Sequence, residues 1–231
     1  PVSVDMRLRF KPFSVEIGQL ALVDGDTHVT ASGQFAATPD GWEFAVDGEV
    51  DQIAPARLVA LWPAALKPGS RAWLDANVSE GMIRNVTFNL RKRQDVPVVI
   101  AARFGVADAA IKFMRTMPLM RDVAGVGYIE KNQMILSLDR GHVPAPQGGL
   151  IDVTGTSMVI LDTRIKGGDA VVKLALDGAI TGVLSLLDRA PFQLITKAGQ
   201  DVTLADGRAI ISGEVQFPLR KGVPPSEVRY D

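Results

Sequence analysis

The chain has 231 residues, of which 47% are apolar and 22% charged, and this composition is typical of a globular protein rather than a disordered one. Its net charge of −1, with acidic and basic residues interspersed, argues against a protein that binds nucleic acid through a basic patch. The absence of cysteine excludes a disulfide scaffold and a thiolate metal site.

Neither a membrane-spanning helix nor a signal peptide is expected, because the chain has no apolar run of about 18 residues and no leader-like start. The chain begins at Pro1 without a methionine and ends soon after a strand-like run. We interpret it as a segment cut from a longer protein.

Alternation of apolar and polar residues predicts β-strands along most of the chain. In MRLRF, for example, Met6, Leu8 and Phe10 alternate with arginines. Asp-Gly pairs at 24–25, 40–41 and 206–207 separate such runs and predict tight turns. Further runs of this type occupy 27–35, 42–50, 86–93, 96–106, 132–141, 148–163, 169–180 and 208–219. Two of them contain Gly48 and Gly178, which we interpret as possible β-bulges.

A helical insert interrupts this pattern at about 54–78. Pro55 suits a first helical turn, and Leu58, Leu61 and Trp62 share one helical face. A second helix is predicted from Ser70, and a short third helix at about 181–190. Residues 107–123 have a mixed pattern that suits a helix only in part.

The coarse prediction is a single mainly β domain over 1–231, with about ten to twelve antiparallel strands joined as a meander and two or three short helices. The helices are too few to cover so large a sheet. The apolar face could therefore be covered in a closed sandwich or barrel, or be left open as a long curved groove, a half-pipe. Periodicity alone does not choose among these.

Little in the sequence resembles catalytic or metal-binding chemistry. His28 and His142 have no His or Cys at metal-ligand spacing, and we interpret both as turn residues. Neither a phosphate-binding glycine motif nor a GxSxG nucleophile motif occurs. We therefore expect no catalytic residues, no metal and no cofactor, and an enzyme is the least favoured interpretation.

The insert carries a resemblance to a known family. LWPAALKPGSRAWLDANVSEGMIRNVTFNLR (61–91) is similar to a pattern of the large AsmA-like proteins of Gram-negative envelopes, in the branch related to YhdP and TamB. Segments 118–143, 176–192 and 213–219 resemble later parts of the same family, so the likeness covers most of 54–220. The matching positions in the insert are Leu61, Trp62, Pro63, Arg71, Trp73, Leu74, Gly81 and the strand 86–90.

This resemblance implies a periplasmic β-groove in a protein that is anchored to the inner membrane by a segment not present here. It implies transport of phospholipid between the inner and outer membranes, with acyl chains and neighbouring β-modules of the same parent chain as partners and no nucleic acid. No catalytic residues are implied. The alternative is a structural module that scaffolds envelope or outer-membrane assembly without transporting lipid.

One phase of the strands would line such a groove, although the sequence does not tell which face of each strand points inward. The candidate lining residues are Leu8, Phe10, Phe35, Phe44, Val46, Phe88, Leu90, Ile100, Phe104, Leu136 and Leu138. In the insert, we expect an apolar face to dock on the sheet as a structural cap, formed by Leu61, Trp62, Trp73 and Leu74.

Overall fold

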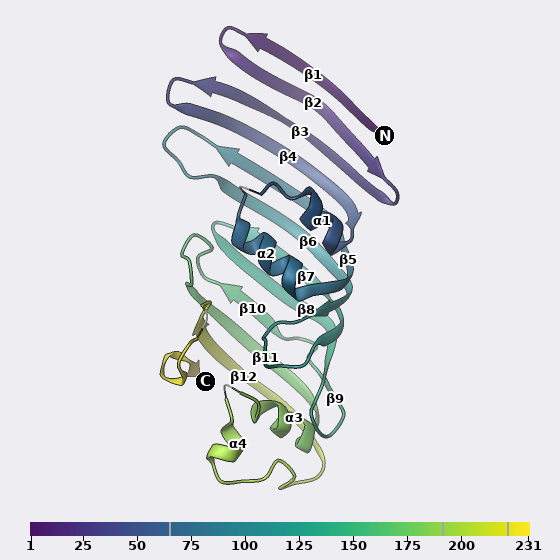
Figure 1. Cartoon of the computed structure of the whole chain (residues 1–231), viewed down its shortest axis with the longest axis vertical. Helices are drawn as coiled ribbons and strands as arrows, with labels where there is room; N and C mark the ends of the chain where they lie inside the picture. The colour runs from purple at the N-terminus through teal and green to yellow at the C-terminus, as the bar shows by residue number, and fades with distance from the viewer. Residues whose placement is uncertain (65, 191, 221) are drawn as a thin grey trace.

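A computed structural model describes residues 1–64, 66–190, 192–220 and 222–231, and the strands of these residues form one antiparallel sheet of thirteen strands. The first eight are neighbours in chain order (Figure 1). They are β1 (Val2–Phe10), β2 (Phe13–Asp24), β3 (Thr27–Thr38), β4 (Gly41–Ile53), β5 (Val78–Lys92), β6 (Val99–Ile111), β7 (Met120–Glu130) and β8 (Gln133–Pro144).

The remaining strands complete the sheet at its C-terminal end. They are β9 (Leu150–Asp152), β10 (Ser157–Ile160), β11 (Asp169–Ala179), β12 (Arg208–Pro218) and β13 (Arg229–Tyr230). The short strands β9 and β10 share one place, because both pair with β8 on one side and with β11 on the other. Since β1 and β13 lie at opposite ends of the strand order, the sheet is not closed into a barrel.

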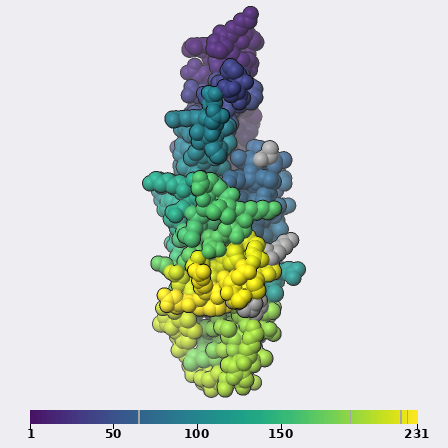
Figure 2. Space-filling view, turned by 90° about the vertical axis from the view of Figure 1, so that its left-hand side faces the viewer, coloured from purple at the N-terminus to yellow at the C-terminus, as the bar shows by residue number. Residues whose placement is uncertain are grey.

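These findings confirm the predicted fold class of a mainly β, antiparallel meander that remains open. The closed sandwich or barrel, the alternative left by the sequence, is wrong. The molecule is elongated, with the N-terminal strands at one tip and the region around residues 180–207 at the other (Figure 2).

The predicted helical insert is present as α1 (Pro55–Leu61) and α2 (Pro68–Asn77), and the predicted third helix is α3 (Ile180–Leu187). The short α4 (Leu194–Lys197) and the 3-10 turn η1 (Pro225–Glu227) were not expected from the sequence. Ala65, within the predicted insert, and Pro191, in one of the family-like segments, lie outside the described residues.

A row of β-bulges crosses the middle strands. Asn85 of β5, Asp108 of β6 and Asp122 of β7 have φ values of 51°, 53° and 51°, and the strand register shifts beside each of them. Asn and Asp tolerate this left-handed conformation better than other side-chain-bearing residues. Arg140 on β8 links two of these bulges, because it donates to the Asp108 carboxylate at 2.5 Å and to the Asp122 carbonyl at 3.2 Å.

Several glycines within strands receive a large side chain from the neighbouring strand. The Phe88 ring lies over Gly48, the Phe104 ring over Gly127, and the Ile151 side chain over Gly178. No register shift occurs at Gly48 or Gly178, so the interpretation of these two as bulges is wrong. Each glycine instead leaves the space that the neighbouring side chain fills.

This packing predicts that a methyl group at Gly127 destabilises the fold, because an added Cβ would lie 2.2 Å from Cζ of Phe104. We expect Gly127→Ala to lower the free energy of unfolding by about 1–3 kcal/mol, the usual cost of overpacking. Urea unfolding measures this change. Gly69→Ala is the matched control, because an added Cβ there meets no atom within 4 Å and lies in α2.

In a Phe104→Ala background, the cost of Gly127→Ala should largely disappear, since the two changes act on one contact. A Gly127→Ala protein as stable as the parent would contradict this account of the glycines.

Candidate functional site: an apolar face along the whole sheet

One face of the sheet is apolar from its first long strand to its last. Side chains alternate between the two faces of a strand, and directly paired residues of antiparallel strands point to the same face. The register therefore connects Leu8 to Val15, Val15 to Phe35, and Phe35 to Phe44. We call this surface the apolar face.

The same pairing continues through the middle and C-terminal strands. Val46 pairs with Leu90, which pairs with Ile100, and Gly127 connects Phe104 to Leu136. Further on, Leu136 pairs with Met158, Met158 with Val172, and Val172 with Val215. All the residues predicted to line a groove lie on this one face: Leu8, Phe10, Phe35, Phe44, Val46, Phe88, Leu90, Ile100, Phe104, Leu136 and Leu138.

The opposite face is mainly polar and carries paired charges, although Tyr128, Ile135 and Ile210 are also exposed on it. Arg91 donates to Asp47 at 2.6 Å, and this bond, with one from Asn89, lowers the pKa of the Asp47 carboxyl. Arg208 donates to both oxygens of Asp177 at 2.5 and 2.6 Å and lowers its pKa in the same way. We call this surface the polar face, and its charges are those expected of a sheet face in water.

The apolar face is most exposed at the N-terminal end of the sheet. Val2, Met6 and Phe10 of β1 are 66%, 60% and 75% exposed, and Trp42 of β4 is 55% exposed. Single exposed apolar residues are ordinary, but a contiguous exposed apolar surface marks a binding site. This end of the sheet is therefore available to a ligand or partner.

Two helical elements cover parts of the apolar face. In α1, Leu58 packs onto the cluster of Val50, Ile53 and Ile83, and Val59 is buried. In α3, Val183 and Leu186 pack against Val143, Ile151 and Val153. Nine of the thirteen buried apolar residues belong to α1, α3 and these two clusters, and the other four, Ala109, Ala110, Val123 and Ala170, lie in β6, β7 and β11.

Of the four residues expected to dock on the sheet, two are exposed and two are half-buried. Leu61 and Trp73 are 43% and 48% exposed, while Trp62 and Leu74 are half-buried. Trp62 stabilises the α1–α2 hairpin, because its indole Nε1–H donates to the Leu66 carbonyl at 2.6 Å.

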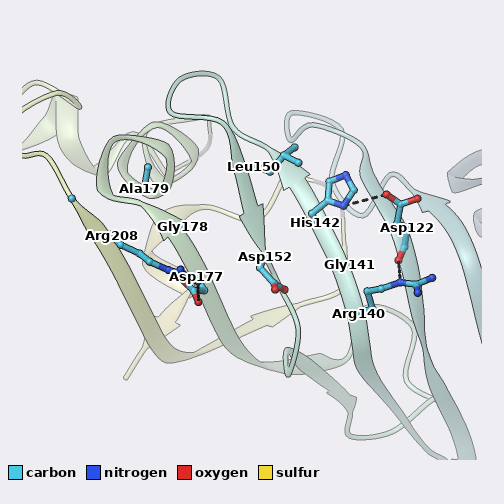
Figure 3. Close-up of a pocket in the computed structure, with 11 residues that line it drawn as sticks. Asp122, Arg140, Gly141, His142, Leu150, Asp152, Asp177, Gly178, Ala179 and Arg208 are labelled. Carbon is cyan, nitrogen blue, oxygen red and sulfur yellow. Dashed lines mark hydrogen bonds and ion pairs between the residues drawn. The ribbon is translucent and has the colours of Figure 1, made fainter.

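A cleft of about 760 Å³ opens on the polar face (Figure 3). Its residues come from five strands and a loop, so no local sequence pattern predicts it. Nδ1 of His142 lies 3.3 Å from the Asp122 carboxylate, and Asp177 is paired with Arg208. Hydrogen bonds from Thr154 lower the pKa of Asp152. The cleft thus presents ionised carboxylates that already have partners.

Neither histidine is a turn residue, contrary to the interpretation from sequence. His142 lies in β8, and His28 lies in β3, where Nδ1 is 2.7 Å from the Asp51 carboxylate. Within the described ranges, no group of His, Asp and Glu side chains is arranged to hold a metal ion. None of the helices described here has the length and apolar character needed to cross a membrane.

Comparisons with known proteins give no relative: no protein-family model, no curated protein and no solved structure matches this chain.

The lowered carboxyl pKa values predict a loss of stability in acid. Hydrogen bonds from Arg164 lower the pKa of Asp162 from 3.8 to about 2, and those of Asp47, Asp152 and Asp177 are also lowered. Between these values and 3.8 the unfolded chain binds more protons than the folded one. Stability should therefore be present above about pH 4 and fall progressively toward pH 2.

Urea midpoints measured at intervals from pH 5 to pH 2.5 test this dependence. Asp162→Asn should flatten the lower part of the curve, because the variant lacks that titration. A midpoint that stays constant or rises as the pH falls would show that these ion pairs do not favour the folded state.

Proposed function

We propose that this chain is a periplasmic segment of an AsmA-like protein anchored in the inner membrane, and that it carries phospholipid along its apolar face toward the outer membrane. The observation that carries the proposal is the unbroken apolar face of an open sheet, exposed most at β1–β4. The sequence resemblance in 54–220 supports the same conclusion.

The chemistry of the face suits acyl chains. Leaving a lipid tail in water costs roughly 0.8 kcal/mol for each CH₂ group, so a carrier needs apolar contact along the whole path. Strands of 11–15 residues, such as β4, β5 and β7, give a face roughly 35–50 Å wide along its contour. The headgroup remains at the open side of the groove, in water, where no dedicated pocket is required.

The free edge of β1 fits the expected partner, a neighbouring β-module of the same parent chain. Among the described strands β1 pairs only with β2, so its outer backbone groups are available to another strand. A strand added there in antiparallel register would extend the apolar face beyond Val2–Phe10. Lipid could then pass from one module to the next without crossing water.

Site-specific photo-crosslinking in cells tests the lipid path. A photoreactive residue at Leu8, Phe44 or Leu136 should give phospholipid adducts that mass spectrometry identifies. The matched controls are the next residues along each strand, Arg9, Ala45 and Ser137, which point to the polar face. Equal lipid labelling on the two faces, or none on either, would refute the proposal.

The alternative is a scaffold for envelope assembly, and the same free β1 edge favours it because that edge can pair with a strand of another protein. Native mass spectrometry of the gently purified chain discriminates between the two functions. Reproducibly bound phospholipid supports transport, whereas a lipid-free chain that captures a protein strand at β1 supports the scaffold.

A further inference from the structure

The α1–α2 hairpin runs across the groove from one rim to the other, where a rim is an edge of the sheet formed by the ends of the strands. Both of its ends lie at one rim, because Ile53 pairs with Ile83 and Val78 pairs with Ile111, which in turn pairs with Met120. We call this hairpin, residues 54–64 and 66–77, the strap.

The tip of the strap reaches the opposite rim. Nζ of Lys67 donates to the Thr163 carbonyl at 3.4 Å, although the two residues are 96 positions apart. The Thr163 N–H donates to the Asn132 carbonyl at 2.7 Å, which ties that loop to the turn between β7 and β8. This turn joins Glu130 to Gln133, at the end of the strands away from Met120.

The length of the strap requires the sheet to bow toward it. In a flat sheet, the 11 residues of β7 and the four strand spacings from β5 to β10 would separate Val78 from Thr163 by roughly 40 Å. The helical path from Lys67 to Val78 covers only about 16 Å. The lysine stem and its hydrogen bond add about 10 Å. The two rims therefore approach each other, and the apolar face is concave here.

The second helix of the strap does not fill this concavity. Its main contacts are with α1 and β5, and no residue of α2 is buried. On the sheet, Leu136 is half-buried and belongs to neither cluster, whereas Phe104 packs against the cluster beneath α1 and Leu138 against the cluster beneath α3. In Figure 1, α2 crosses in front of the middle strands.

We propose that the strap and the sheet together enclose a section of the groove, and that acyl chains pass through it beneath α2. The inference rests on the proposed lipid transport and adds a site to it. Because the section is bounded at both rims and lined by aliphatic and Phe side chains, its occupant has to be a thin, flexible and apolar chain. A folded partner protein fits only the uncovered face at β1–β4.

Tryptophan fluorescence offers a direct test, because the three tryptophans of the chain are distributed between the open face and the strap. Trp42→Phe leaves only Trp62 and Trp73, both in the strap. Trp62→Phe with Trp73→Phe leaves only Trp42, on the open part of the apolar face. Each variant is loaded with phospholipid brominated along its acyl chains, or with the same lipid without bromine.

Bromine quenches tryptophan only at short range, so we expect a comparable fractional loss of fluorescence in both variants. Quenching of Trp42 without quenching of the strap tryptophans would overturn the enclosed section and leave the proposed transport intact. Absence of quenching in both would overturn the proposed transport itself.

The rim-to-rim path has an independent test that uses no lipid. The chain lacks cysteine, so Lys67→Cys with Thr163→Cys introduces the only two thiols. A short bis-maleimide should join them within one chain and shift its gel mobility, whereas each single variant should show no shift. Failure of the double variant to cross-link would show that the strap does not reach the far rim.

Discussion

The strand register is the constraint on which the rest of this structure depends. Because side chains alternate along a strand, a slip of one residue between two strands would turn every apolar side chain of one of them to the other face. Within several strands the apolar residues switch between odd and even positions, and a bulge at the switch keeps them on the same face of the sheet. In β2 the apolar positions are Phe13, Val15 and Ile17, followed by Leu20 and Leu22, and the register shifts between Ile17 and Leu20. The extra residue keeps both sets on one face.

The same devices account for the shape of the sheet. Bulges increase local bending and twist, and the row at Asn85, Asp108 and Asp122 crosses adjacent strands on the side where the strap begins. The glycines beneath Phe88 and Phe104 let these rings lie close to the neighbouring strand and so add aromatic side chains to the apolar face. The bending of the sheet, the common orientation of its apolar side chains and the packing of its aromatic rings thus arise from local features of single strands. Together they favour a concave apolar face, and the described strands form no second sheet that covers it.

This division between local and distant features explains how much the sequence could predict. Alternation, Asp-Gly turns and the proline-led helix are local, so the meander, the turns at 24–25 and 40–41 and the insert at 54–78 were predictable. The common face of Leu8 and Leu138 depends on every register between them, which no single run specifies. The packing of Leu58 onto Ile83, the Lys67–Thr163 contact and the polar cleft join residues far apart in the chain. The sequence pattern of a single strand or helix does not predict such contacts.

The two ends of the sheet therefore differ in how a ligand can reach them. At β1–β4 the apolar face is exposed, so an apolar ligand can approach it from the side along the strands. The rims approach each other at the strap, and beyond it α3 covers the face at Val143 and Ile151, so this part of the face is less accessible from the side. A strand added at β1 would extend the open part, whereas the covered part lies toward β12. If lipid is carried, exchange with a neighbouring module would take place at the β1 end, and the strap would mark the point beyond which a chain moves only lengthwise.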